Sequence, residues 1–449
     1  MTLKGLAKLS FAISLTLTLA IIILISLGLS FLNRITKSGL IGYGGLIFLC
    51  TLTIFLAKTT FKSKFFLILL SVLIPYAGAV FAFYYLIFKV ENKDEKNRNV
   101  DLWVEKRDFL TDGKNQTTYF YKAADAWTDF LTELRKAKEE VLIFSYIFES
   151  GKASSGLVTV IHDLLKRGVK VKLGVDYYGS GNVKSCEEFK ALRSRGMDVF
   201  VTNKPFAIFL PKHQIRTHAK VYIIDKKICY LPSFNITDQS VFRDKNCCVK
   251  IKGNIGFAYN AFFPLFGVEK IEEKPDESIL AVLSKGKEAE NLYVAALNKS
   301  RKTVKIVTPY LSFGGRVYDA IKRAIRRGVL ITIVIPPTDK LPKLDAVSLR
   351  SARILREEGV SINEYKGEFL HCKMIIVDDF LSITGSLNFD ERSAVSAVES
   401  FIISVDNGLI GGLLEDFDQI KLSSYPFLAA RLGKTKIFDK ILGVFSPLV

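Results

Sequence analysis

The chain has 449 residues, and its 63 Lys plus Arg residues exceed its 45 Asp plus Glu residues to leave a formal net charge of +18. This excess favours a phosphate-rich partner, either an anionic membrane surface or nucleic acid. The six cysteines show no Cys-x-x-Cys spacing, which argues against a disulfide framework and favours a reducing compartment.

Three uncharged, mostly apolar stretches of 22, 20 and 24 residues occupy the N-terminal part of the chain, at 11–32, 38–57 and 65–88. Each is at or near the ~20 residues that a helix needs to cross a bilayer, so we expect residues 1–90 to form a transmembrane region. The first stretch is too long for the core of a signal peptide, and no small-x-small cleavage site follows it. The third, which Pro75 and Gly78 interrupt, could instead be a re-entrant or interfacial segment.

A charged linker at residues 91–108 leads to a region in which one order of elements occurs twice. In the first half, the run VLIFSYIF (141–148) precedes a helical stretch ending in KRGV, the strand VKVKLGVD and a helix around CEEFKALRSRG. In the second half, VKIVTPYLS (304–312) precedes AIKRAIRRGV, the strand VLITIVIP and a helix near VSLRSARILREEG. The repeated β-α-β-α-β-β order indicates an internal duplication.

The near-continuous apolar strands between these helices predict the fold class. Strands of this kind are typical of a mostly parallel sheet that helices cover on both faces, as in α/β proteins. We predict two such lobes related by the duplication, the first at 109–270 and the second at 271–449, each of ordinary domain size. The aromatic stretch GFAYNAFFPLFG (256–267) is expected to be a packed helix, with membrane contact as the alternative.

Both halves contain a frame of identical spacing: His-x-Lys, four residues, Asp, nine residues, Asn. The first copy places it at His218, Lys220, Asp225 and Asn235, and the second at His371, Lys373, Asp378 and Asn388. Each His and Lys lie two residues apart at the start of a β-branched run, where the alternation of a strand points both side chains to one face. A single copy would more often be a solvated strand end, but exact duplication favours a catalytic site.

Two facing copies of this frame suit attack on a phosphodiester. A neutral imidazole can attack phosphorus while a protonated imidazole opposite donates to the leaving oxygen, because histidine titrates near ~6.5. The lysines, the Asn amides and the nearby hydroxyls of Ser233 and Ser386 would hold the non-bridging oxygens. We expect no metal and no other cofactor, since an ammonium repels a cation and clusters of thiolate or carboxylate ligands are missing.

These motifs resemble the phospholipase D superfamily, and in detail its bacterial cardiolipin synthase branch. The resemblance extends from about residue 65 to the C-terminus and includes SYIFES (145–150), GVDYYGS (174–180), TPY (308–310) and GSLNFDERS (385–393). It implies transfer of a phosphatidyl group from phosphatidylglycerol through a covalent phosphohistidine. Relatives of this branch commonly carry two membrane spans, whereas this chain offers three.

The resemblance also implies a role for each residue of the site. His218 would be the nucleophile, and His371 the general acid and then the general base. The lysines, Asn235, Asn388 and the two serines would bind phosphate. Asp244 and Glu399 would accept hydrogen bonds from the outer imidazole nitrogens and so orient the two rings. Asp225 and Asp378 belong to the catalytic motif, and we expect them to act mainly as ion-pair partners at strand ends.

Several interpretations remain open at this stage. The favoured one is a multi-pass cell-membrane enzyme that condenses two phosphatidylglycerol molecules into cardiolipin and glycerol, with its catalytic region in the cytoplasm. With three spans, the flanking Lys and Arg residues conflict with the positive-inside rule. Water as acceptor would give a phospholipase D. A nuclease is disfavoured because the three apolar stretches and the aromatic stretch at 256–267 favour a lipid substrate, so no nucleic acid partner is expected. Pro232 stands where the second copy has Gly385, which raises the alternative of a catalytically impaired membrane scaffold. The oligomeric state is not predicted.

Overall fold

The computed structural model describes residues 114–180, 187–203, 216–272, 276–285, 287–337 and 346–427. All of these residues belong to one compact unit. The predicted transmembrane region 1–90 and linker 91–108 lie outside the described residues. Within the ranges that the structure describes, no helix combines the length and the apolar character needed to cross a membrane.

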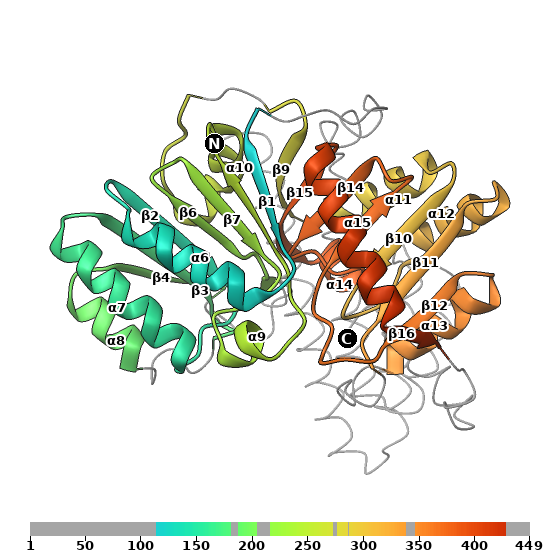
Figure 1. Ribbon diagram of the computed structural model, residues 1–449, viewed down its shortest axis with the longest axis horizontal. Helices are drawn as coiled ribbons and strands as arrows, with labels where there is room; N and C mark the ends of the chain where they lie inside the picture. Colours follow the sequence, from blue (N-terminus) through green and yellow to red (C-terminus); the bar gives the residue numbers. More distant parts are fainter. Residues whose placement is uncertain are drawn as a thin grey trace, which may run out of the picture. The chain divides into compact units, whose positions relative to one another are not determined.

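The first lobe is built on a seven-stranded sheet with the strand order β1-β8-β7-β6-β2-β3-β4 (Figure 1). Its elements are β1 (Gln116–Phe120), α6 (Ala123–Arg135), β2 (Glu140–Ser145), α7 (Lys152–Lys166), β3 (Lys170–Asp176), α8 (Glu187–Ser194), β4 (Asp198–Thr202), β6 (Val221–Ile224), β7 (Ile228–Pro232), α9 (Asp238–Phe242) and β8 (Cys248–Lys252).

The second lobe repeats the plan on a nine-stranded sheet, with the order β16-β12-β11-β10-β13-β14-β15-β5 and with β9 also paired to β15. Its elements are β5 (Arg216–Thr217), α10 (Gly256–Phe266), β9 (Ile279–Ser284), α11 (Glu288–Lys299), β10 (Thr303–Val307), α12 (Gly315–Arg326), β11 (Leu330–Ile335), α13 (Ala346–Glu357), β12 (Ser361–Tyr365), β13 (Met374–Val377), β14 (Leu381–Gly385), α14 (Glu391–Val395), β15 (Ala397–Ser404), α15 (Asn407–Leu422) and β16 (Ser424–Pro426).

The α/β architecture and its duplication agree with the prediction, but the expectation of mostly parallel sheets is wrong. Only β2, β3 and β4 run parallel in the first sheet, whereas β6, β7, β8 and β1 pair antiparallel to their neighbours. In the second sheet, β10, β11 and β12 run parallel, and β13, β14 and β15 pair antiparallel. The reason is that the strand after each His-x-Lys turns back at once as a hairpin, and a short turn can join only antiparallel strands.

The turns of these two hairpins are alike in backbone conformation. Asp225 and Lys226 have φ of 51° and 56°, and Asp378 and Asp379 have φ of 52° and 61°. Positive φ at two successive residues is the signature of the type I′ turn, whose twist matches that of the strands it joins. Aspartate tolerates this region better than most residues. The Asp of the repeated frame is therefore a turn residue in both copies.

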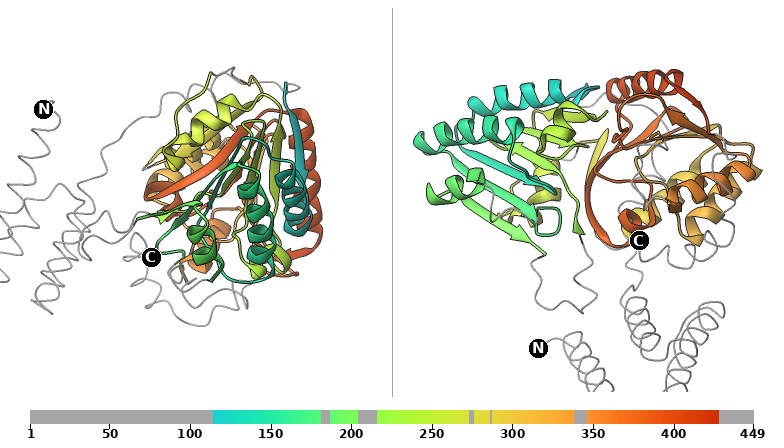
Figure 2. Two further views of the ribbon diagram at one scale, coloured as in Figure 1. Left: turned by 90° about the vertical axis from the view of Figure 1, so that its left-hand side faces the viewer. Right: turned by 90° about the horizontal axis from the view of Figure 1, so that it is seen from below.

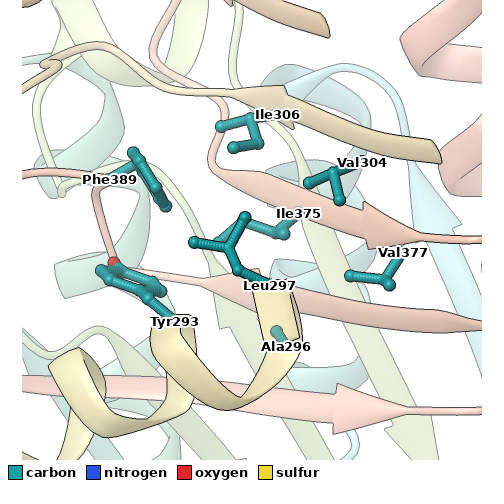
Figure 3. A pocket seen from close by; sticks show the side chains of 8 residues that line it. All are labelled: Tyr293, Ala296, Leu297, Val304, Ile306, Ile375, Val377 and Phe389. Atoms are coloured by element: carbon teal, nitrogen blue, oxygen red, sulfur yellow. The ribbon is translucent and has the colours of Figure 1, made fainter. Parts of the chain in front are cut away.

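Helices cover the outer face of each sheet, cyan to green in the first lobe and yellow to orange in the second (Figures 1 and 2). In α12, Val317, Ala320, Ile321 and Ala324 are buried at the spacing of one helix face. Burial of each large aliphatic side chain contributes roughly 1.5–3 kcal/mol. The outer core of the second lobe has a small apolar cavity of about 10 Å³ between α11 and the sheet (Figure 3), which is too small to be a substrate site.

A third core lies between the lobes and joins them. It contains residues of both sheets together with α10 and α15, and the buried side chains Phe262 of α10 and Phe417 of α15 contribute to it. The stretch at 256–267 is thus a packed helix, as expected. Two strands from the first half of the chain also contact the second lobe. The short strand β5 pairs with β15 in the second sheet, and Tyr119 of β1 donates a hydrogen bond to Asp416 of α15 at 2.7 Å. Such crossing holds the two halves in register.

Candidate active site

The two His-x-Lys segments meet where the lobes adjoin. His218 directly follows β5, which pairs with β15, and His371 lies just before β13. The segment around His371 is tied to the first lobe by a pair of backbone hydrogen bonds. The Lys245 amide donates to the Phe369 carbonyl at 3.0 Å, and the His371 amide donates to the Lys245 carbonyl at 2.8 Å. Each motif is thus anchored on the opposite lobe, so neither lobe alone holds the pair.

His218 is oriented by a carboxylate from the second lobe. Its Nδ1 lies 3.1 and 3.0 Å from the two Glu399 oxygens, and Glu399 is fully buried on β15. The hydroxyls of Ser386 and Ser393 donate to the same carboxylate at 2.5 and 2.7 Å. Burial alone raises the pKa of Glu399, but His218, Lys220 and the hydrogen bonds outweigh it and hold the pKa below its usual value. Glu399 is therefore charged, and it accepts from the ring as the sequence predicts.

His371 is oriented by Asn246, and the prediction that Asp244 would do so is wrong. His371 Nδ1 lies 3.0 Å from Asn246 Oδ1, and Asn246 is fully buried. Asp244 instead accepts a hydrogen bond from Gln239 at 2.7 Å. Asp244 lies in the segment between α9 and β8, and its carboxylate interacts across the lobe interface with Lys373.

The sequence contains a signal for Asn246 that was overlooked. Glu399 lies eleven residues after Asn388, and Asn246 lies eleven residues after Asn235. The resemblance implied a carboxylate, Asp244, although the spacing of the second copy points to Asn246 two residues later. The duplication therefore extends to the orienting residues, with a change from Glu to Asn.

The serines lie behind the histidines and bind their orienting groups. Ser233 donates to Asn246 Oδ1 at 2.7 Å, as Ser386 donates to Glu399. Both serines are buried, with 1% and 0% of their surface exposed. The hydroxyl protons are thus directed at the orienting side chains, and the predicted contact with phosphate is not what the geometry shows. Pro232 stands where the second copy has Gly385, and the hydrogen bond from Ser233 to Asn246 is nevertheless formed in the first copy.

The two asparagines of the frame also face protein groups. Asn235 Oδ1 accepts from the Ile147 amide at 3.2 Å, and the carbonyl of Asn388 accepts from the Tyr293 hydroxyl. Asn388 Oδ1 is buried without a partner in the described structure. The predicted phosphate contact of the two side chains stays a prediction.

Two buried lysines dominate the electrostatics of the site. Lys220 Nζ donates to the His218 carbonyl at 2.9 Å, and Lys373 Nζ donates to the His371 carbonyl at 2.5 Å. Burial, and then repulsion from Lys373, holds the pKa of Lys220 well below its usual value. Burial lowers the pKa of Lys373 to about 7. Glu399 interacts with both lysines, Asp176 with Lys220 and Asp244 with Lys373. Because burial lowers the pKa of both lysines, an incoming phosphate would stabilise their charged forms.

Asp225 and Asp378 lie at the far end of the strands from the histidines, and their predicted catalytic assignment is not supported. The Asp225 carboxylate accepts from the backbone amides of 138–140 at 2.8, 2.8 and 3.0 Å. The Asp378 carboxylate accepts from those of 301–303 at 2.7, 2.7 and 2.8 Å. We expected ion pairs at these two aspartates, but each carboxylate instead accepts hydrogen bonds from three backbone amides. Both residues secure the chain just before β2 and β10.

Aromatic rings that the prediction did not include flank the two histidines. Tyr146 packs edge-on to His218 with 5.0 Å between ring centroids, and Lys220 Nζ lies 5.6 Å from the same ring. Phe369 lies 5.9 Å from the His371 ring. Tyr146 directly follows β2, and the end of a buried strand next to a turn is a common place for a site residue. Apolar rings beside the histidines limit water and strengthen the charge interactions.

Comparison with known proteins supports the same family from several sides. A family model described as cardiolipin synthase, PLD-like domain, matches residues 130–260 and 293–421. The chain is 26% identical over 303 residues to the minor cardiolipin synthase ClsB of Bacillus subtilis, with 62% of this chain and 75% of that protein covered. It is 25% identical over 381 residues to cardiolipin synthase 1 of Staphylococcus aureus, with 78% and 76% covered. Among solved structures, phosphatidylserine synthase of Haemophilus influenzae shares the fold with a TM-score of 0.59 at 13% identity, over 74% of this chain and 93% of that one.

The duplicated α/β fold, the paired histidines and these relatives define a phosphatidyltransferase of the phospholipase D superfamily. Because the family model matches more than half of its length, the chain belongs to the cardiolipin synthase, PLD-like domain family. The resemblance inferred from the motifs is confirmed.

Proposed function

We propose that the protein is a membrane-bound cardiolipin synthase that transfers a phosphatidyl group from one phosphatidylglycerol to another through a phosphohistidine. The observation that carries the proposal is the pair of interlobe histidines, each with its Nδ1 held by a buried acceptor. This arrangement leaves both Nε2 atoms available to a phosphate beside Lys220 and Lys373.

In the first half-reaction, His218 Nε2 attacks phosphorus and the bond from phosphorus to the glycerol oxygen breaks. His371 gives its Nε2 proton to that oxygen, and glycerol leaves. The N-phosphorylated ring of His218 carries positive charge, which the Glu399 carboxylate stabilises at 3.0 Å. The lysines stabilise the charge on the non-bridging oxygens in the transition state.

In the second half-reaction, neutral His371 accepts the proton of a glycerol hydroxyl of the second phosphatidylglycerol. The oxygen of that hydroxyl attacks phosphorus, the bond from phosphorus to nitrogen breaks, and cardiolipin leaves. His218 returns to the neutral state, and His371 again holds the proton that it gave up in the first half. The cycle needs no metal or redox partner to balance it.

We further propose that residues 11–32, 38–57 and 65–88 anchor the two catalytic lobes, 109–270 and 271–449, at the membrane that supplies the lipid. The linker 91–108 joins anchor and lobes, with the catalytic region on the cytoplasmic side. The net charge of +18 favours an anionic lipid surface as the partner.

Product analysis tests the proposed reaction. Detergent-solubilised full-length protein is incubated with phosphatidylglycerol, and the lipids are resolved by mass spectrometry. Cardiolipin and glycerol in equal amounts are expected. Phosphatidic acid without cardiolipin would instead make the protein a hydrolase, and no turnover at all would favour the scaffold. The matched variant His218→Ala should form neither cardiolipin nor a phosphoenzyme, and a phosphoenzyme that persists in it would overturn the choice of nucleophile.

A further inference from the structure

The two catalytic histidines have equivalent positions but chemically different partners. Glu399 places a carboxylate on Nδ1 of His218, whereas Asn246 places a neutral amide on Nδ1 of His371 at nearly the same distance, 3.0 Å. Both partners are fully buried. A carboxylate stabilises an imidazolium, and an amide oxygen does so much less, because a charge-assisted hydrogen bond is about twice as strong as a neutral one.

The orientation of the Asn246 amide is determined by its other contacts. Its Nδ2 donates to the Ser240 carbonyl at 3.0 Å, and its Oδ1 accepts from the Ser233 hydroxyl at 2.7 Å. The oxygen therefore faces His371, and His371 Nδ1 must be the donor. The exchangeable proton of His371 is then confined to Nε2, the atom that faces the substrate in the proposed reaction.

This part of the site is built for an amide and not for a carboxylate. In the second copy, the residue equivalent to Ser240 is Ser393, and its hydroxyl donates to Glu399. In the first copy the backbone carbonyl of Ser240 occupies that role, and a carbonyl can only accept a hydrogen bond. The asymmetry thus includes the surroundings of Asn246 as well as Asn246 itself.

The other groups around His371 reinforce the difference. The charged or titratable groups that face it in the described structure are Lys373, Lys220 and His218, and all of them oppose its protonation. Burial, and then these cations, hold the pKa of His371 well below its usual value. For His218, burial also lowers the pKa, but Glu399 opposes the decrease.

We propose that Asn246 is a positioning residue that confines the mobile proton of His371 to Nε2 and denies its imidazolium a counter-charge, so that His371 is the stronger acid of the pair. The inference rests on the proposed phosphatidyl transfer. A stronger acid protonates the leaving glycerol readily and is correspondingly a weaker base toward the second lipid. Formation of the phosphoenzyme needs the protonated His371 ring and its resolution needs the neutral ring, so the pKa of His371 sets the pH dependence of transfer.

The variant Asn246→Asp tests the inference, because it changes one atom type at constant volume. An opposite charge within a few Å raises the pKa of a histidine by about 1–3 units. The pH optimum of transfer is the mean of the two apparent values of the coupled pair, so it should increase by about 0.5–1.5 units. An unchanged optimum in a variant that retains turnover would overturn the inference.

Glu399→Gln is the matched control, since it makes the reverse change on the other histidine. It should lower the pH optimum, whereas a merely structural role for either residue would reduce the rate without moving the optimum. The test also separates the inference from the proposed function. A protein that made only phosphatidic acid would still show both opposite shifts, with the hydrolysis rate as the readout.

A measurement on the unsubstituted protein decides the case in which Asn246→Asp does not fold. The chain has four histidines, so ¹⁵N-histidine labelling gives few ring signals, and loss of one set in His371→Ala assigns His371. A neutral ring protonated on Nδ1 at pH 6 is expected for His371. An imidazolium at that pH, or a ring protonated on Nε2, would contradict the inference.

Discussion

A substitution of Asp378 tests whether the Asp of the repeated frame stabilises the fold or takes part in the reaction. Asp378→Ala removes a carboxylate that accepts three backbone amide bonds at 2.7, 2.7 and 2.8 Å. With a net contribution of about 1 kcal/mol per bond, the variant should lose about 3 kcal/mol of unfolding free energy. At about 2 °C per kcal/mol for a large domain, this is a decrease of about 6 °C in the unfolding midpoint.

Asp379→Ala is the matched control for the loss of an aspartate from this turn. Asp379 is the next residue of the same turn, and its φ of 61° is close to the 52° of Asp378, so the loss of an aspartate from the left-handed region affects both variants alike. Its carboxylate pairs with Lys305 at 2.8 Å and is about half exposed. Exposed pairs contribute about 0–1 kcal/mol. The difference between the two variants therefore isolates the three amide bonds.

The assay combines thermal unfolding of the full-length protein in detergent with the rate of transfer per folded molecule, measured well below the midpoint. Asp378→Ala should unfold earlier and retain its rate. A rate loss of about a hundredfold or more with an unchanged midpoint would place Asp378 in the acid–base chemistry, where effects of that size are usual, and would refute the reasoning.

The remaining predictions concern the site itself. Burial lowers the pKa of Lys373 to about 7, and a bound phosphodiester should raise it, so binding of glycerophosphoglycerol takes up a proton and weakens as the pH rises above 7. Calorimetry in two buffers would show this, and Lys373→Met should abolish the pH dependence. A pH-independent affinity in the parent would contradict it. Ser386→Ala removes one of the two hydroxyl donors of Glu399 and leaves Ser393, at a cost of about 1–3 kcal/mol, so transfer should slow about 10–100-fold. A rate equal to the parent's would argue against a positioning role. Pro232→Gly should leave the rate almost unchanged, because the Ser233 amide already bonds the Cys247 carbonyl at 2.9 Å as the Ser386 amide bonds Ser400 at 2.8 Å. A large gain would revive the scaffold interpretation.

Much of the fold could be predicted because its signals are local. The alternation of apolar residues and the helix periodicity located the strands and helices of both halves, and the order of elements revealed the duplication. The direction of the strands was not predictable in the same way, because a strand such as β13 carries no local mark of its pairing partner. It pairs antiparallel with β10, which lies far away in the chain.

The site shows the same division. The repeated spacing pointed to His218 and His371 without any structure. The family resemblance named Glu399, whose carboxylate lies 3.0 Å from His218 Nδ1. The serines and the aspartates of the frame were harder, because a hydroxyl or a carboxylate is suited equally to a phosphate or to a backbone amide. Asn246 was missed because we expected a carboxylate, although Asn246 has the same spacing from Asn235 as Glu399 has from Asn388. Its contact with His371, 125 residues away in the other lobe, became visible only in the structure.

The sequence by itself determined that this protein has two related halves, two His-x-Lys motifs and a basic site suited to a phosphodiester, because spacing and residue type are properties of the chain. Only the tertiary structure decided which group faces which histidine. That choice depends on the packing of β15 and of the segment before β8 across the lobe interface, where a carboxylate meets one ring and an amide meets the other. The inequality of the two halves thus arises from contacts between segments far apart in the chain.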